Sequence, residues 1–264
     1  MSKTIVIILN HNLPEYTNWL FNSLVEHQDE SYDLFIMDNG SKPDLIPEDT
    51  LIRFEKNLFF GGALNEAFKL VLNNYQYDSL LFLNNDIEVN AGIFVKTLRY
   101  ELFQNDFAII SPCIAGRAQP WKQMQNWGSK GTRKVRWIDN QAPLFHRKLI
   151  ESIGQFDPAL FYGWGQELIC MDVCESNGWK IGVCDHISML HFGKQTVLRN
   201  GLFSVEKDIQ AIDNFTPVTL TEFQNKAMES YVNYFRDHPI EGVTFDDLRT
   251  YGENYTYDPF FARE

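Results

Sequence analysis

The fold class follows from one stretch, Leu80-Leu81-Phe82-Leu83-Asn84-Asn85-Asp86-Ile87-Glu88. Its apolar run is typical of a buried parallel strand, and polar side chains follow the end of that strand at once. In open α/β sheets, ligands bind at the carboxyl ends of the strands. Asp86, with Asn84 or Glu88, offers the oxygen ligands that Mg²⁺ and Mn²⁺ prefer. An ordinary polar turn after a strand would give the same pattern, because Asn and Asp are frequent turn residues.

The composition is that of a globular protein with a sizeable core. The chain has 264 residues, of which 44% are hydrophobic and 14% aromatic, enough for one large α/β domain or a domain with an appendage. No apolar run reaches the roughly 18 residues of a membrane-spanning helix, and the N-terminus lacks the pattern of a signal peptide. We therefore expect a cytoplasmic protein without a transmembrane segment, with peripheral attachment to the inner membrane face as a second option.

The cysteines give no sign of a metal site or of a disulfide framework. Of the four, Cys170 and Cys174 are four residues apart on an expected helix, while Cys113 and Cys184 are isolated. No second pair has the spacing of zinc ligands. We expect reduced, structural thiols.

The charge is strongly negative but unevenly distributed. The net charge of −12 excludes attraction of nucleic acid by the protein as a whole. Segment 117–148 nevertheless carries eight basic residues and one acid, whereas residues 201–264 carry twelve acids and five bases. The basic segment could bind an anion locally.

In the first half of the chain, buried strands alternate with amphipathic helices, and each strand ends in a polar cluster. A helix expected over 14–26 places Trp19, Leu20, Ser23 and Leu24 on one face. The expected strands are 5–9, 34–37, 51–54 and 80–83, and a second helix spans 61–73. This order predicts an α/β fold with a mostly parallel sheet and one ligand-binding edge.

The second half of the chain continues the pattern less regularly. We expect a helix over 93–103, a loop or hairpin over 116–136, a helix over 168–176 and strands over 107–112, 142–147, 180–184 and 187–191. The acidic C-terminal part predicts helices over 221–236 and 245–251, packed on the main domain.

Six segments together resemble the inverting family 2 glycosyltransferases of the GT-A fold, especially their rhamnosyltransferase-like members. They fall in the order and rough spacing of that family and are residues 8–12, 38–41, 57–65, 83–86, 156–167 and 191. The resemblance implies a GT-A (Rossmann-like) catalytic domain over 1–200, with a mostly parallel sheet flanked by helices. Residues 201–264 lie outside it and form the mostly helical extension.

The resemblance implies a nucleotide site at the ends of the strands. Its candidate residues, which would lie by the nucleobase, ribose or diphosphate, are Asn10, His11, Asn12, Asp38, Asn57, Gly62, Asn65, Asn84 and Asn85. Asp38 matches an acid that usually contacts the base; an Asp that starts a turn is the structural alternative, and the resemblance favours contact with the nucleotide. Phe59 stands where many relatives have Gly, which leaves the backbone of this loop open.

The resemblance also implies a divalent metal, Mn²⁺ or Mg²⁺, held by Asp86 and by His191. The stretch Asn84-Asn85-Asp86 looks like the Asp-x-Asp motif of the family with its first acid replaced by Asn. The metal would then depend on Asp86, and weak or optional metal dependence is an alternative.

Glu167 falls at the position of the catalytic base of the family. An inverting transfer needs a carboxylate that takes the proton of the acceptor hydroxyl. A glutamate favoured by a helix N-terminus is the structural alternative, and both can hold. Trp164 and Gln166 are the candidates for contact with sugar and acceptor. Relatives carry Asp where this chain has Leu168, so Gln166 or Asp172 could share the role of the base.

The predicted donor is a nucleotide-diphosphate sugar, UDP- or dTDP-linked by preference, and the predicted acceptor is a saccharide or a lipid-linked saccharide. Basic residues interleaved with Trp121, Trp127 and Trp137 raise a second option, a modified nucleic acid as acceptor. We favour tryptophans that stack on sugar rings beside a solvated basic rim. A non-catalytic nucleotide-sugar-binding protein of the same fold is the alternative outside enzymes.

Overall fold

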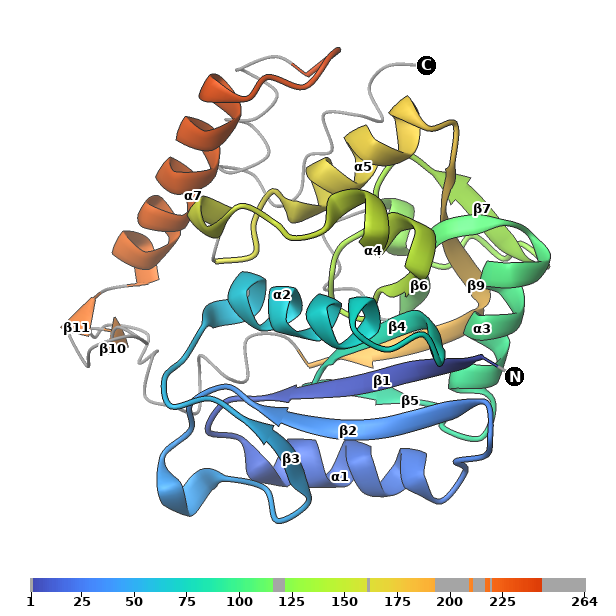
Figure 1. Ribbon diagram of the computed structural model, residues 1–264, viewed down its shortest axis with the longest axis vertical. Coiled ribbons are helices and arrows are strands. Elements are labelled where there is room, and N and C mark those ends of the chain that lie inside the picture. Colours follow the sequence, from blue (N-terminus) through green and yellow to red (C-terminus); the bar gives the residue numbers. More distant parts are fainter. Residues whose placement is uncertain are drawn as a thin grey trace.

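The computed structural model describes residues 2–115, 122–160, 162–192, 209–210, 217–218 and 220–243, drawn in colour in Figure 1. Within these ranges, the side chains of residue 122 and of residues 209–228 are not described. The helix expected over 245–251 lies outside the described residues.

The N-terminal half of the chain forms a parallel sheet in the order β3-β2-β1-β4. Its strands are β1 (Lys3–Asn10), β2 (Tyr32–Asp38), β3 (Thr50–Arg53) and β4 (Tyr77–Asn84). Strands β1 and β4 are apolar throughout their centres: Ile5–Ile8 and Leu80–Leu83 are at most 2% exposed. Such continuous apolar runs arise because parallel strands are covered on both faces.

The second half of the sheet mixes directions. Strand β8 (Leu144–His146) runs antiparallel between β4 and β6 (Phe107–Ala115), and β9 (Lys180–His191) lies parallel to β6. Strands β5 (Ile87–Val89) and β7 (Thr132–Val135) pair antiparallel with β9. The prediction of an α/β fold with a mostly parallel sheet is confirmed.

Helices cover both faces of the sheet, as Figure 1 shows for α1 below and α2 above the parallel strands. The described helices are α1 (Pro14–Val25), α2 (Phe59–Leu72), α3 (Phe94–Gln104), α4 (Arg147–Ile153), α5 (Gln166–Ser176) and α7 (Leu220–Asp237). Short 3-10 turns are η1 (Pro43–Leu45), η2 (Lys122–Met124) and η3 (Pro158–Leu160), and β10 (Ile209–Gln210) pairs with β11 (Pro217–Val218).

Four details differ from the sequence-based expectation. Helix α1 buries Leu20 and Leu24, but Trp19 is 45% exposed instead of sharing their face. Helix α2 begins earlier, at Phe59, whose N–H is bound by the side chain of Asn57. Strand β5 was not predicted, because three residues are too short for a periodic signal. The strands expected over 180–184 and 187–191 form one strand, β9. An irregularity in its pairing with β6 accommodates the residues between them.

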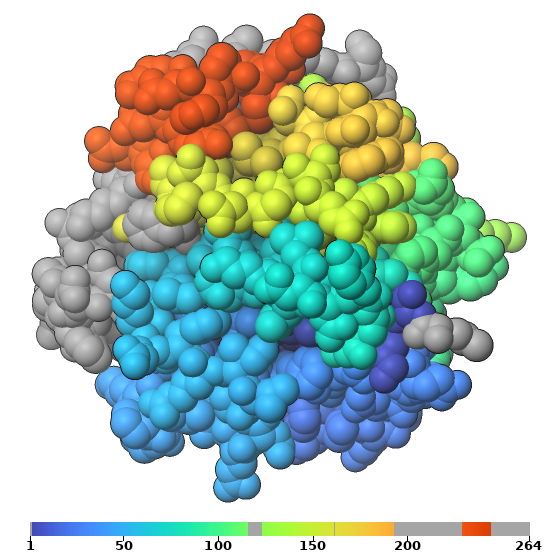
Figure 2. All heavy atoms as spheres, viewed as in Figure 1, coloured from blue at the N-terminus to red at the C-terminus, as the bar shows by residue number. Residues whose placement is uncertain are grey.

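The C-terminal helix α7 packs on the turn that precedes α5. Its Ser230 hydroxyl donates to the carbonyl of Ala159, at 2.6 Å, and the rings of Tyr231 and Phe235 are buried. Figure 2 shows this helix, in red, against the yellow-green and yellow surface formed by the residues from α4 to α5. Helix α7 therefore holds the residues that come just before α5 in place.

No helix in the described ranges combines the length and the apolar character needed to cross a bilayer.

Candidate functional site

The polar ends of the parallel strands meet at one edge of the sheet, as their pairing requires. Asn10 lies opposite Asp38 in the β1–β2 register, and Leu9 lies opposite Asn84 in the β1–β4 register. The three candidate loops after β1, β2 and β4 are thus neighbours, which is the arrangement that a ligand at the carboxyl edge needs.

Asn10 and Asp38 form the buried base of this edge. The Asn10 amide donates to Asp38 at 2.7 Å and to Ser41 at 3.0 Å, and its oxygen accepts from the Thr17 hydroxyl at 2.8 Å. Asp38 also accepts from the N–H of Ser41, and both candidates are fully buried. Their bonds within the chain fix the shapes of the loops after β1 and β2.

His11 and Asn12, the next two residues after Asn10, are half-buried. The Nδ1 atom of His11 is 2.9 Å from the carbonyl oxygen of Asn39, and Asn12 accepts from the N–H of Lys42. Burial lowers the pKa of His11, which outweighs the opposing effects of the Asn39 carbonyl and of the Asp38 charge. The imidazole is therefore neutral near pH 7, a form suited to hydrogen bonding with a neutral base or sugar.

The loop before α2 is locked by two asparagines. Asn39 donates to Asn57 Oδ1 at 2.9 Å and accepts from the N–H of Leu58. Phe59, which stands where many members of the resembled family have Gly, has φ of +56°, and its N–H donates to Asn57 Oδ1 at 2.7 Å. A positive φ is costly for a phenylalanine, so this loop carries strain that the asparagine pair offsets.

Gly62 and Asn65 lie inside α2 rather than at its start. A β-carbon at Gly62 would come within 2.9 Å of Leu58, so the glycine permits close packing of the helix entry. Both polar atoms of Asn65 bind the backbone of Phe156, at 2.9 and 2.7 Å. Asn65 therefore ties α2 to the segment that leads to Glu167.

The loop after β4 turns back into the site. Asn84 is half-buried at the strand end, and Asn85 donates to the Thr17 hydroxyl at 2.9 Å. Asp86 follows, only 5% exposed, immediately before β5. Its carbonyl accepts the N–H of Phe192 at 2.9 Å.

The β5–β9 pairing brings Asp86 and His191 together. Ile87 lies opposite His191 in the register, and His191 Nε2 is 3.2 Å from Asp86 Oδ1. Burial disfavours the imidazolium, but the hydrogen bond and charge of Asp86 prevail, so the pKa of His191 is raised. A carboxylate and an imidazole that already face each other have the chemistry of a Mn²⁺ site.

The donor set fits a metal that shares its coordination with a ligand. Among the described residues, no three His, Cys, Asp or Glu side chains gather around one point. Asp86 and His191 would thus supply two ligands, and the other positions suit phosphate oxygens and water. Because Asn84 stands in place of an acid, Asp86 and His191 would be the metal ligands that the protein supplies.

Glu167 lies in the first turn of α5, 7% exposed. Burial is the main cause that raises its pKa to about 8, helped by the charge of Asp139 and opposed by the backbone N–H groups of Glu167 and Gly165. A carboxylate whose pKa lies near neutrality can accept a proton and release it again, which is what a general base requires.

Two glycines shape the loop before Glu167. Gly163 has φ of +97° and Gly165 has φ of +87°, conformations that other residues rarely adopt. Trp164, between them, packs partly against the core. Gln166 is fully buried: its amide donates to the Leu160 carbonyl, and its Oε1 has no hydrogen-bond partner. The contact between Gln166 and an acceptor stays a prediction.

Sequence reasoning missed the segment Asp139-Asn140-Gln141. The charge of Asp139 raises the pKa of both Glu167 and His191. The carbonyl of Gln141 accepts the N–H of Asn84, which fixes the segment against the end of β4. Asn140 is 9% exposed, and neither polar atom of its side chain has a partner. The sequence feature that could have pointed to this segment is its position: three polar residues lie between the apolar pairs Trp137-Ile138 and Ala142-Pro143.

Four of the eight basic residues of segment 117–148 form ion pairs with acids of the same chain. Ion pairs join Arg133 to Asp185, Arg136 to Glu175, Arg147 to Glu151 and Lys148 to Asp106. Trp137 is 1% exposed, and the guanidinium of Arg133 lies 4.2 Å from the ring centroid of Trp127. These contacts do not favour tracking of a nucleic-acid backbone.

Comparison with known sequences gives distant relatives. No family model matches the chain. Uncharacterised proteins of Mycobacterium bovis and Mycobacterium tuberculosis are 25% identical over 190 residues, which span 69% of this chain and 71% of theirs.

Solved structures give the fold. S. aureus TarS (residues 1–349) has a TM-score of 0.60 at 13% identity, over 99% of this chain and 72% of that one. GalNAc-T7, solved with UDP, GalNAc and Mn²⁺, also has a TM-score of 0.60 at 13% identity, over 99% and 55%. The mannosyltransferase PcManGT of Pyrobaculum calidifontis, with GDP-Man and Mn²⁺, has 0.57 at 13%, over 96% and 69%. The chain thus has the GT-A fold of these glycosyltransferases.

Proposed function

We propose that this protein is a glycosyltransferase of the inverting family 2 type, which moves a sugar from a nucleotide-diphosphate sugar to an acceptor hydroxyl. The observation that carries the proposal is the meeting of Asp86 and His191, 3.2 Å apart, at the sheet edge where the loops after β1, β2 and β4 converge. Neighbours of the same fold were solved with UDP or GDP-Man and Mn²⁺, which supports a nucleotide-sugar donor.

The donor nucleotide would lie along the edge formed by His11, Asn12, Asn57 and Asn84. Asn10 and Asp38 are fully buried, and both polar atoms of Asn65 bind backbone groups, so these three would hold this edge in shape rather than contact the ligand. We retain UDP- or dTDP-linked sugars as donors. A divalent metal held by Asp86 and His191 would offset the charge of the diphosphate leaving group.

In this proposal, Glu167 is the general base. It takes the proton of the acceptor hydroxyl while the hydroxyl oxygen bonds to the anomeric carbon and the bond from that carbon to the diphosphate breaks, with inversion. Burial and the charge of Asp139 keep the carboxylate basic enough for this step. Trp164 offers an apolar face beside it. The acceptor is a saccharide or a lipid-linked saccharide.

A non-catalytic nucleotide-sugar-binding protein is the second candidate. Asn84 in place of the first metal-binding acid and Leu168 after the candidate base are the features that favour it. It predicts nucleotide binding without transfer.

The test is calorimetric binding of UDP, dTDP, GDP and CMP, each with Mn²⁺ and with a chelator. We expect one nucleoside diphosphate to bind, with affinity lost on chelation and in Asp86→Asn. Asp237→Asn, at an exposed residue of α7, is the control. Absence of binding by all four with a folded protein would overturn the donor site.

A measurement of turnover is needed to distinguish the enzyme from the non-catalytic binding protein. Glu167→Gln should keep nucleotide affinity and lose release of the nucleoside diphosphate from the matching donor sugar. Unchanged turnover in this variant would remove Glu167 as the base, and a wild-type protein that binds but never turns over would favour the second candidate.

A further inference from the structure

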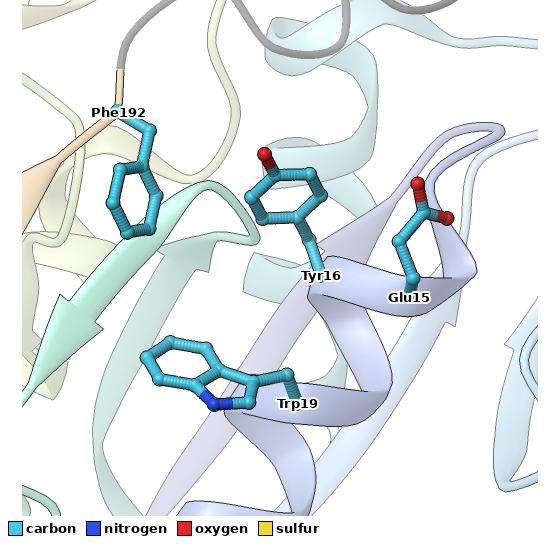
Figure 3. A pocket seen from close by; sticks show the side chains of 4 residues that line it. All are labelled: Glu15, Tyr16, Trp19 and Phe192. Atoms are coloured by element: carbon cyan, nitrogen blue, oxygen red, sulfur yellow. The ribbon is translucent and has the colours of Figure 1, made fainter.

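A hollow outside the site described above opens between the start of α1 and the end of β9. It has a volume of about 320 Å³ and is lined by Glu15, Tyr16, Trp19 and Phe192. Figure 3 shows the rings of Tyr16, Trp19 and Phe192 gathered around one space, with Glu15 beyond Tyr16 on the same helix. The centroids of the Tyr16 and Phe192 rings are 5.9 Å apart.

The helix period explains why these side chains share a surface. Trp19 follows Glu15 by four residues and Tyr16 by three, so all three project from one side of α1. The neighbouring residues Thr17, Leu20 and Leu24 of the same helix are buried. Trp19 is 45% exposed and Phe192 is 39% exposed. Clustered aromatic rings left accessible to solvent typically mark a binding surface.

Hydrogen bonds join both elements that line the hollow to the loop that carries Asn85 and Asp86. On the β9 wall, the N–H of Phe192 binds the carbonyl of Asp86 at 2.9 Å. On the α1 wall, Thr17, the neighbour of Tyr16, accepts from Asn85 at 2.9 Å. A ligand in the hollow would therefore lie beside the loop that we assign to the metal and the donor.

We propose that this hollow binds a sugar ring of the acceptor saccharide. The C–H faces of a sugar ring pack on aromatic rings, while its hydroxyls need polar partners, and the hollow offers both in three rings and the carboxylate of Glu15. The inference rests on the proposed function, because it is the transferase reaction that requires an acceptor.

The experiment is saturation-transfer NMR with methyl α- and β-glycosides of glucose, galactose, mannose, rhamnose and N-acetylglucosamine, without nucleotide. We expect at least one glycoside to bind the wild-type protein. Trp19→Ala should weaken that binding about tenfold, the effect of losing one stacked ring. Tyr100→Ala, at a residue that is 62% exposed on α3, should leave the affinity unchanged. Thermal melting verifies that each variant is folded.

A parallel titration of UDP and dTDP with Mn²⁺ separates this inference from the proposed function. Nucleotide binding that survives Trp19→Ala, with glycoside binding weakened about tenfold, supports the acceptor site. No glycoside binding, or equal binding in wild type and Trp19→Ala, overturns it even where the nucleotide binds. Glycoside binding that depends on Trp19 without any nucleotide binding would support the sugar site and overturn the donor site alone.

Discussion

The backbone of Gly165 lies directly against the ring of Phe235. A β-carbon at residue 165 would be 2.7 Å from Cε2 of Phe235 and 2.9 Å from the ring of Tyr231. Gly165 is two residues before Glu167 and has φ of +87°. Helix α7 thus presses on the loop that presents the candidate base, so the C-terminal part of the chain supports the site although it lies outside the family resemblance.

Gly165→Ala should destabilise the protein by about 3 kcal/mol, because the new methyl group meets two buried rings and the positive φ is strained. Gly178→Ala is the matched control: Gly178 has φ of +67°, but nothing lies within 4 Å of its β-carbon position. It should cost only the backbone strain, about 1 kcal/mol. Urea unfolding measures both. Equal losses would show that α7 does not press on Gly165.

The cysteines should resist thiol reagents in the folded protein. All four are free and buried, and burial raises the pKa of Cys113 to about 11 and that of Cys174 to about 12. The thiolate, which is the reactive form, is therefore scarce and inaccessible at pH 8. Titration with an aromatic disulfide reagent should label four thiols in denaturant and none, on the same time scale, in buffer. Rapid labelling without denaturant would contradict this burial.

Most of the sheet could be predicted because its apolar strands are local signals. The polar ends of β1, β2 and β4 had to meet once those strands were parallel, so the edge with Asn10, Asp38 and Asn84 follows from sequence. The approach of Asp86 to His191 does not: it depends on β5, three residues long, pairing with a distant strand. Only the family resemblance pointed to His191.

The segment 139–141 was missed for a different reason. Three consecutive polar residues look like a solvent-exposed turn, and burial of such a segment depends on tertiary packing that no local pattern reports. The contact between α7 and Gly165 was likewise invisible, because it joins a helix to a glycine far away in the sequence.

The side chain of Asn140 should lower the free energy of unfolding of the protein. Both polar atoms of its buried side chain lack partners, and an unsatisfied buried amide is unfavourable by roughly 1–3 kcal/mol. Asn140→Leu, of similar size, should therefore leave the free energy of unfolding unchanged or raise it by about 1 kcal/mol. If Asn140 binds substrate hydroxyls, the same change should weaken turnover of the donor sugar.

Asn65→Ala is the contrasting variant for this measurement. Asn65 is also an asparagine near the site, but both its polar atoms bind the backbone of Phe156. Its loss should lower the free energy of unfolding by about 2 kcal/mol. A comparable loss in Asn140→Leu would mean that the Asn140 amide is bonded in the folded protein.

The raised pKa of Glu167 makes stability depend on pH with a definite sign. The folded protein holds the proton of this carboxyl up to about pH 8, whereas the unfolded chain releases it near 4.5. The folded state therefore binds more protons between these values, so this group lowers the stability of the wild-type protein as pH rises from about 4.5 to about 8, with no further change above.

Glu167→Gln removes this effect. The variant should match the wild type near pH 4 and exceed its free energy of unfolding by a few kcal/mol at pH 9, since each pKa unit corresponds to about 1.4 kcal/mol. Glu48→Gln, at an exposed residue, should show no such growing difference. Urea unfolding across this pH range decides the matter. The rate of transfer should also rise toward pH 8, because the Glu167 carboxyl loses its proton there. A difference in free energy of unfolding that stays constant with pH would mean that Glu167 is ionised in the folded protein at neutral pH. A rise of the transfer rate toward pH 8 would then have another origin.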